Sequence, residues 1–225
     1  MFPRSPVALR EWAVVCDALA RGEQIFVLRD DLPLRDVEDE APDRGPAAAT
    51  DGDGGPAGEE RAAGGGPVGA TPADRADALL HEEFWLWPEW EDQRAARLTD
   101  PYRDRKRSLD ELRHRDGRVR LAYYATIEYV ERITDPGRLL ALDGEHALNA
   151  RAVEQLTDPT LLVLRVWRRP EAALVARDEA RPGAGPWVRL PDPVPTEEAE
   201  AVVADERFLS EKARILRRAG SVRAV

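Results

Sequence analysis

Several features that commonly reveal a protein's function are scarce in this sequence. Cys16 is the single cysteine among 225 residues, so the chain forms no internal disulfide and has no all-cysteine zinc site. No apolar run approaches the ~20 residues that a membrane-spanning helix needs. The first residues lack the basic and apolar regions of a secretory signal. We therefore expect a cytoplasmic protein with no membrane contact, no bound metal and no cofactor.

The negative charge of the chain is concentrated in one segment. Residues 30–78 contain 13 acidic residues and four arginines, a net charge of −9, whereas the whole chain carries −10. This segment has no aromatic residue and no apolar period, so it cannot bury enough surface to offset the entropy of ordering. We predict a disordered acidic loop. It would be a tolerated insertion, a partner-binding segment or an electrostatic mimic of nucleic acid.

Apolar patterns elsewhere predict a mixture of strands and helices. Helices are expected at 6–21, 88–98, 137–157 and 207–219, and strands at 25–29, 84–87, 121–127, 161–167, 172–176 and 187–190. Gly22 and Gly220 suit the left-handed residue that follows a helix. Because no regular βαβ alternation is present, we predict an α+β fold. Residues 1–29 and 79–191 would form one compact domain, interrupted by the loop 30–78 and followed in 192–225 by an acidic linker and a basic helix.

Two segments resemble a known family. Residues 8–29 read ALREWAVVCDALARGEQIFVLR, and residues 84–93 read FWLWPEWEDQ. Both are similar to the prokaryotic family catalogued as domain of unknown function 1802, and the resemblance implies a prokaryotic protein but no reaction. The family's second segment carries a His-Gln pair where this chain has Asp92 and Gln93. Gln93, which keeps half of that pair, is a candidate binding residue.

The first segment also resembles, more loosely, small RNA-binding or ligand-binding barrels of the ASCH and PUA type. Their entry is likewise a helix, a Gly-Glu turn and a strand that ends in arginine, which here is Arg29. Its guanidinium would hold a phosphate or a carboxylate through two parallel hydrogen bonds. The alternative is an ion pair with Glu11 or with an acid of residues 30–78.

Three tryptophans fall within six residues. On a strand, Trp85 and Trp87 share one face, and exposed aromatic rings stack against nucleic-acid bases. The alternative is core packing, which the apolar residues on both faces of this strand favour. Trp90 follows the proline among charged residues and is expected to be more exposed. Trp87 and Trp90 are both candidate binding residues.

Positive charge gathers in two stretches. Residues 94–120 contain ten basic and five acidic residues, and residues 207–225 contain six basic residues and one acid. Arg105 and Arg107 are the candidate phosphate contacts of the first stretch. If both stretches lay on one surface, they would form a nucleic-acid footprint. Otherwise each would pair with nearby acids.

The acids around residues 82–92 suggest a different function. Clustered carboxylates bind Mg²⁺ in metal-dependent hydrolases and nucleases, but no Nudix or common nuclease motif accompanies these acids. His146 beside Glu145 would serve as a general base or be an ordinary surface histidine. No catalytic residue is assigned.

Our leading hypothesis is therefore a non-enzymatic module that binds nucleic acid or a nucleotide. A metal-dependent hydrolase is the first alternative. A protein that recruits partners through its acidic segment is the second.

Overall fold

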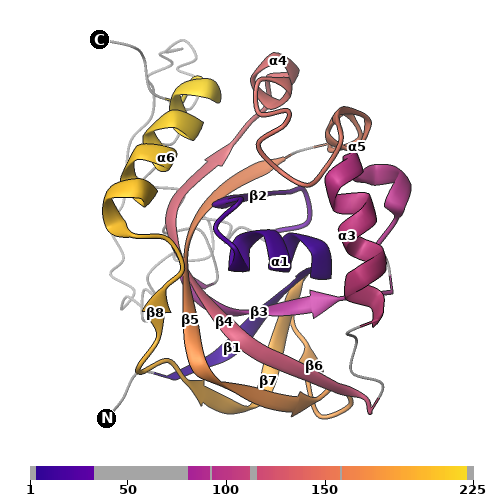
Figure 1. Cartoon of the computed structure of the whole chain (residues 1–225), viewed down its shortest axis with the longest axis vertical. Coiled ribbons are helices and arrows are strands. Elements are labelled where there is room, and N and C mark those ends of the chain that lie inside the picture. The colour runs from indigo at the N-terminus through magenta and orange to yellow at the C-terminus, as the bar shows by residue number, and fades with distance from the viewer. Residues whose placement is uncertain (1–3, 33–80, 92, 112–115, 158, 222–225) are drawn as a thin grey trace, which may run out of the picture.

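A strongly curled mixed sheet forms the centre of the molecule (Figure 1). The computed structural model describes residues 4–32, 81–91, 93–111, 116–157 and 159–221. The strands are β1 (Arg4–Trp12), β2 (Phe26–Arg29), β3 (Glu83–Glu89), β4 (Arg118–Arg132), β5 (Thr160–Ala176), β6 (Arg181–Pro182), β7 (Trp187–Pro195) and β8 (Glu200–Ala201). Their order in the sheet is β2-β5-β4-β3-β1-β7-β6, and β8 also pairs with β5. The β1–β3 pair is parallel, and the other pairs are antiparallel.

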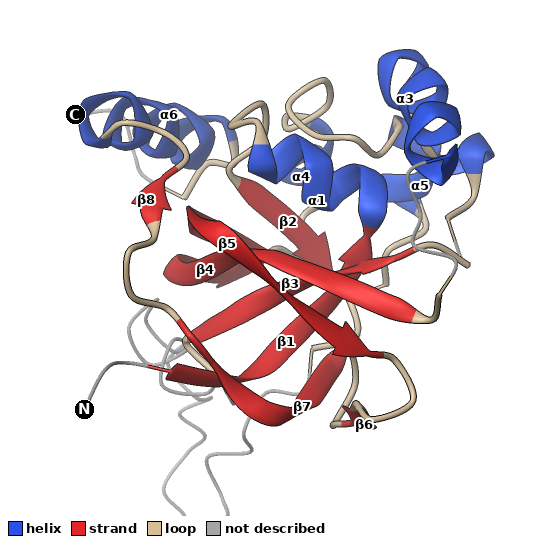
Figure 2. Ribbon diagram, turned by 60° about the horizontal axis from the view of Figure 1, so that its bottom comes forward, coloured by secondary structure: helices blue, strands red, loops and turns tan. Residues whose placement is uncertain are grey.

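The helices gather over one end of the curled sheet (Figure 2). They are α1 (Ala13–Ala20), the 3-10 helix η2 (Ala95–Arg97), α3 (Asp100–Glu111), α4 (Pro136–Leu140), α5 (Ala150–Glu154) and α6 (Asp205–Arg218). Helices and strands thus build on a single sheet, and the predicted α+β class is confirmed. Residues 33–80 lie outside the described residues. Most of the segment predicted to be a disordered acidic loop, residues 30–78, lies in that range.

Both faces of β1 and β3 are buried. On one face Leu9, Phe84 and Leu86 pack in a cluster with Val14 and Val15 of α1. On the other face Ala8, Trp85 and Trp87 pack with residues of β4 and β7. The sheet therefore has a core on each side at its centre, and the apolar content of the chain is divided between them.

The helix predicted at 6–21 is wrong in its first half. Residues 4–12 form β1, which lies between β3 and β7, and the helix begins only at Ala13. A central strand covered on both faces has a continuous apolar run, which periodicity cannot distinguish from a buried helix. Ser5 pairs in the sheet opposite Val194 and therefore does not cap a helix. Gly22 does take the predicted left-handed conformation, with φ +64°.

Two further boundaries differ from the prediction. Pro88 lies within β3 rather than ending it, and the helix expected at 88–98 is reduced to η2. Beyond Trp85, the described pairing of β3 is with β1 alone, and a strand tolerates proline where one edge is free. Residues 172–176, expected as a separate strand, continue β5 along β4.

The predicted strands at 25–29, 121–127, 161–167 and 187–190 are confirmed as β2 and as parts of β4, β5 and β7. The short α4 and α5 replace the longer helical region expected at 137–157. The segment 192–206, expected as a linker, holds the end of β7 and β8. The last helix is confirmed, and Gly220 follows it with φ +66°.

Candidate functional site

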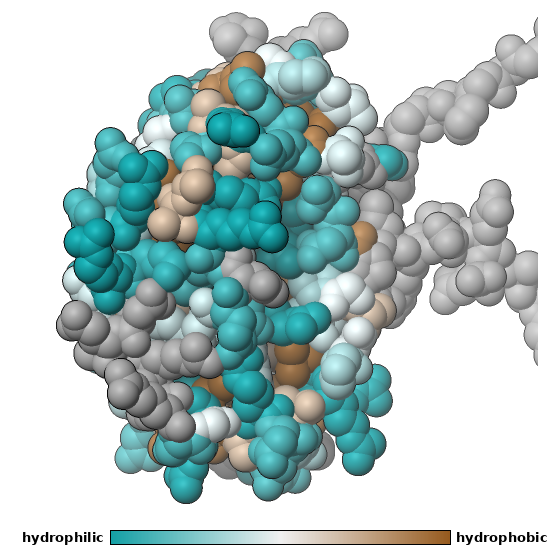
Figure 3. Space-filling view, turned by 90° about the vertical axis from the view of Figure 1, so that its right-hand side faces the viewer, coloured by the Kyte–Doolittle hydropathy of each residue, from teal (hydrophilic) through white to brown (hydrophobic). Residues whose placement is uncertain are grey.

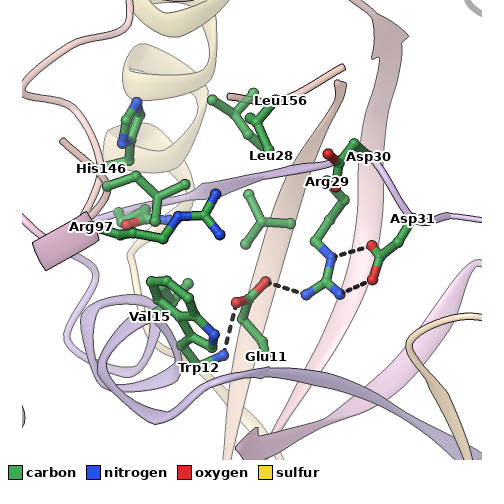
Figure 4. A pocket seen from close by; sticks show the side chains of 13 residues that line it. Glu11, Trp12, Val15, Leu28, Arg29, Asp30, Asp31, Arg97, His146 and Leu156 are labelled. Atoms are coloured by element: carbon green, nitrogen blue, oxygen red, sulfur yellow. Dashed lines mark hydrogen bonds and ion pairs between the residues drawn. The ribbon is translucent and has the colours of Figure 1, made fainter. Parts of the chain in front are cut away.

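A pocket of about 190 Å³ lies where the ends of β1 and β2 meet the helical layer (Figure 4). We call it the β1–β2 pocket. Its lining also comes from α1, from η2 and from the segment between α4 and β5. The apolar walls are Val15, Leu28, Leu148 and Leu156, and the polar groups include Glu11, Arg29, Asp31, Arg97 and His146.

Arg29, at the end of β2, is held by two carboxylates and a backbone carbonyl. Its Nη1 donates to Oε2 of Glu11 at 2.8 Å and to the carbonyl oxygen of Arg10 at 2.9 Å. Its Nε and Nη2 donate to the two carboxylate oxygens of Asp31 at 2.8 and 2.6 Å. Burial alone would lower the pKa of Arg29. The two carboxylates raise this pKa by more than burial lowers it, so the guanidinium stays charged. Both ion pairs considered as the alternative to ligand binding are present.

The change from strand to helix positions Glu11. β1 ends at Trp12, whose backbone N–H donates to Oε1 of Glu11 at 2.8 Å. The side chain of Glu11 is only 10% exposed. Its two oxygens therefore have one fixed partner each, Trp12 and Arg29, and each oxygen retains capacity to accept a further hydrogen bond.

Arg97, on η2, reaches into the β1–β2 pocket with few partners of its own (Figure 4). Its guanidinium carbon lies 5.6 Å from the centroid of the Trp12 ring, a cation–π contact. Nη2 donates a long hydrogen bond of 3.4 Å to the carbonyl oxygen of Ala152, and Nε is buried with no described partner. No carboxylate forms an ion pair with Arg97 among the described residues. A half-buried cation in this state is poised to receive an acceptor oxygen.

His146 is buried in the same pocket, with 4% of its surface exposed. Neither ring nitrogen forms a hydrogen bond of good geometry with the described residues, and the ring packs edge-on against Phe26 at 5.6 Å. Burial lowers the pKa of His146 to about 4, against weaker opposing effects of Asp143, the Leu148 backbone and Glu145. The ring is therefore neutral at pH 7, with one donor and one acceptor available. The expectation of an ordinary surface histidine is wrong.

The loop that carries His146 is fastened at two points. Gln24 accepts from the backbone N–H of Ala147 at 3.0 Å and donates to the carbonyl oxygen of Phe26. Glu145 is paired with Arg214 and with Arg218, at 2.7 Å for the latter, and these pairs attach the loop to α6. The pocket wall is thus held by contacts with both β2 and α6.

A second hollow, of about 220 Å³, shares Glu11, Trp12, Arg29 and Asp31 with the β1–β2 pocket. We call it the adjoining hollow. It adds Arg10, Glu89 and Pro186, and Nη2 of Arg10 donates to the carbonyl oxygen of Gly185 at 3.2 Å. Within the described part of the chain, Arg10 forms no ion pair. The two hollows together therefore present two arginines, Arg10 and Arg97, with uncommitted charge.

Of the other predicted binding residues, Trp87 and Gln93 are buried. Trp87 is 2% exposed and packs in the core with Trp85, so it offers no face to a ligand, and its selection as a stacking residue is corrected. Gln93 accepts through Oε1 from the backbone N–H of Val14 at 2.9 Å and thereby supports the first turn of α1. Its Nε2 is buried without a partner among the described residues.

Trp90 is half-buried and lines a separate, mainly apolar pocket of about 290 Å³ between α1, β3, α3 and β4. Cys16 lines this pocket too and is buried. Burial raises the pKa of the Cys16 thiol, so it is protonated at neutral pH and is a poor nucleophile.

Arg105 and Arg107 lie on α3, away from the β1–β2 pocket. Arg105 pairs with Glu23 through both Nη atoms, lies 3.6 Å from Asp17 and covers the ring of Tyr102. The hydrogen bond with Glu23, together with the carboxylate charges, raises the pKa of Arg105 against the effect of burial. Arg107 is exposed. Figure 3 shows this side of the molecule as largely hydrophilic, with scattered apolar spots.

The second basic stretch is on α6, which lies on the opposite side of the helical layer from α3 (Figure 1). Lys212 pairs with Glu128 at 3.1 Å, and Arg214 with Glu211 at 2.6 Å. The two basic stretches therefore do not merge into one surface, and much of their charge is paired locally.

The acids around residues 82–92 make local contacts. Glu83 accepts from the hydroxyl of Tyr124, and Arg177 pairs with Glu89 at 3.3 Å and with Glu91 at 3.1 Å. Burial raises the pKa of Glu89, but hydrogen bonds from its neighbours and the charge of Arg177 lower it overall. Asp92 lies outside the described residues. Within the described ranges, no group of three or more His, Cys, Asp or Glu side chains is arranged to hold a metal ion.

The fold and the site define an α+β protein with a polar pocket beside the ends of β1 and β2. The model of the family described as "Domain of unknown function (DUF1802)" matches residues 71–214, more than half of the chain, and the protein belongs to this family. The match includes Arg97 and His146, whereas β1, α1 and β2 precede it. The likeness to ASCH and PUA barrels is not confirmed: no curated protein and no solved structure matches the chain. No helix among the described residues is long and apolar enough to cross a membrane.

Sequence reasoning selected Arg29 but missed Trp12 and Arg97 and set His146 aside. The helix expected at 6–21 has Trp12 in its middle, whereas the structure has Trp12 at the end of β1, beside the pocket. Arg97 was one of ten bases in a charged stretch, and nothing in its spacing marked it.

Proposed function

We propose that this protein is a non-enzymatic binding module, and that its ligand is a nucleotide or the end of a nucleic-acid chain. The ligand binds in the β1–β2 pocket and extends into the adjoining hollow. The observation that carries this proposal is Arg97, which is half-buried and stacked on Trp12, with its Nε unpaired. A cation taken partly out of water without a carboxylate partner favours a ligand that supplies the missing acceptor.

The chemistry of the β1–β2 pocket suits a nucleobase. A base has apolar faces and an edge of donors and acceptors, and the pocket combines aliphatic walls with a few converging polar groups. Arg97 supplies donors, Glu11 supplies acceptors, and neutral His146 supplies one of each.

The adjoining hollow suits the phosphate of the same ligand. It shares four lining residues with the β1–β2 pocket, so one molecule can span both. Arg10 lies there with a single hydrogen bond to a carbonyl oxygen and no described ion pair. A phosphate would provide that arginine with a charged acceptor.

The basic helices support a weaker version of the same function. Arg105 on α3 and Arg214 on α6 are engaged with carboxylates, so a phosphate would have to displace existing ion pairs. The pocket requires no such exchange at Arg97 or Arg10. We therefore place the ligand in the pocket rather than along the basic stretches.

Calorimetric titration with adenosine and guanosine monophosphates tests this proposal. Arg97→Gln should weaken binding of the nucleotide that binds better by roughly tenfold, as expected for the loss of a charged hydrogen bond worth about 1.5 kcal/mol or more. Arg94→Gln is the matched control, because Arg94 is an exposed arginine immediately before η2. Equal affinities of the two variants would refute the assignment of the pocket.

A further inference from the structure

Asp31 makes the closest ion pair of Arg29 and the one most open to solvent. Its two oxygens accept from Nε and Nη2 of Arg29 at 2.8 and 2.6 Å, which is a bidentate arrangement. The side chain of Asp31 is 48% exposed, whereas Arg29 is 15% exposed. Asp31 also lines both the β1–β2 pocket and the adjoining hollow. It therefore occupies the outer edge of Arg29, where the two hollows meet.

The two carboxylates on Arg29 differ in how firmly they are held. Glu11 is 10% exposed and is fixed by the backbone N–H of Trp12, so it is part of the interior. Asp31 follows β2 and has no second hydrogen bond to its carboxylate among the described contacts. An exposed ion pair contributes only about 0–1 kcal/mol because water and salt screen it. Asp31 is thus exchangeable, whereas Glu11 is not.

A bidentate carboxylate on arginine presents two anionic oxygens in the same geometry as a phosphate. We propose that Asp31 competes with the ligand's phosphate for the Nε and Nη2 edge of Arg29. When the ligand binds, its phosphate displaces the Asp31 carboxylate from this edge. This inference rests on the proposed function, because it concerns the same site. In the free protein Asp31 fills the anion position, and in the complex the phosphate bridges Arg29 and Arg10.

The position of Asp31 in the chain supports this role. It belongs to the acidic segment 30–78, whose net charge is −9. The next residue, Leu32, packs against the core cluster that contains Leu9 and Val27. That apolar contact holds the first residues of the segment beside Arg29, so the competing carboxylate is supplied at high local concentration.

The test compares Asp31→Asn with Asp192→Asn in the full chain. Each variant removes one negative charge, but Asp192 is exposed on β7 and lines neither the β1–β2 pocket nor the adjoining hollow. Each variant and the wild type are titrated with inorganic phosphate and with adenosine monophosphate by calorimetry, and their melting temperatures are compared. Asp31→Asn should bind both probes at least fivefold more tightly than the wild type. Asp192→Asn should differ from the wild type by twofold at most.

A further variant identifies the group that is released. In the Asp31→Asn background, Arg29→Gln should return the phosphate affinity to that of the wild type or below. Equal gains in Asp31→Asn and Asp192→Asn would overturn the inference, because the effect would then be one of overall charge. Weaker binding in Asp31→Asn would overturn it too, because Asp31 would then orient Arg29 for the ligand. Absence of phosphate and nucleotide binding in a folded Asp31→Asn variant has the same consequence.

The two probes separate this inference from the proposed function. If phosphate gains affinity in Asp31→Asn, but the nucleotide binds no better than phosphate and ignores Arg97→Gln, the competitor is real and the nucleotide assignment fails. If nucleotide binding depends on Arg97 but not on Asp31, the proposed function stands and the competitor is refuted.

Discussion

The β1–β2 pocket and the basic helices both contain basic side chains, but these side chains differ in whether they have carboxylate partners. On α3 and α6, Arg105, Lys212 and Arg214 reach carboxylates of neighbouring elements. In the pocket and the adjoining hollow, Arg97 and Arg10 have no described carboxylate partner, and neither ring nitrogen of the buried His146 forms a hydrogen bond of good geometry with the described residues. The pocket has fewer positive charges than the helices, but more of its charge is uncommitted.

This difference shows why the charge count along the sequence and the partners of each charge in the structure favour different surfaces. Ten bases in residues 94–120 predicted a phosphate footprint, but a chain with 43 acids offers partners to most exposed bases. The binding capacity of an arginine depends on whether its partners are already supplied by the fold. Arg97 belongs to the same basic stretch as Arg105, and tertiary structure alone separates them.

Trp87 could be a ligand platform, in place of the pocket, only if its ring were not part of the core. Because Trp87 packs in the core, Trp87→Ala should destabilise the protein by about 3–5 kcal/mol. Trp90→Ala, at a half-buried position, should cost clearly less. Urea unfolding of both variants measures this difference. Similar small losses would show that Trp87 is not a core residue.

The buried His146 should make the stability of the protein depend on pH. Its pKa is about 4 in the folded protein and about 6.5 when unfolded, so between these values the unfolded chain binds more protons. Stability from this group is therefore complete above pH 6.5 and is lost as the pH falls towards 4. The expected loss is about 1.4 kcal/mol per pH unit, or about 2 kcal/mol between pH 6.5 and 5.

Urea unfolding at several pH values, on the wild type and on His146→Leu, isolates this contribution. The leucine variant cannot titrate at this position, so its stability should fall less steeply over the same range. Carboxylates such as Glu131 and Glu145, whose pKa values are lowered, act at more acidic pH and are common to both proteins. Parallel curves for the two proteins would mean that the His146 ring is hydrated in solution.

Much of the fold could be predicted from the sequence, because several elements follow local rules. The nearly continuous apolar run at 161–167, which contains two β-branched valines, predicted β5, and the two left-handed glycines marked the ends of α1 and α6. β1 could not be predicted, since Leu9 and Ala8 face two different cores and the resulting apolar run fits either structure. The candidate site depends on that strand, because Glu11 and Trp12 are at its end.

Arg29 illustrates the part of the site that the sequence did reveal. Its place at the end of a buried strand was correct, and both of its alternative partners, Glu11 and an acid of residues 30–78, are present. The sequence did not show which distant segments lie close together in space. Long connections bring η2 and the His146 loop to β2. Contacts of that kind arise from the packing of the whole domain and leave no local pattern.

The central claim is that ligand binds in the β1–β2 pocket and not along the basic helices. The most direct test is titration with adenosine and guanosine monophosphates at several salt concentrations, comparing Arg97→Gln with the double variant Arg105→Gln, Arg107→Gln. We predict that Arg97→Gln weakens nucleotide binding about tenfold at each salt concentration, because Arg97 contacts the base and not the phosphate. The α3 double variant should match the wild type in both affinity and slope. Loss of affinity in the α3 variant with unchanged binding in Arg97→Gln would contradict the account.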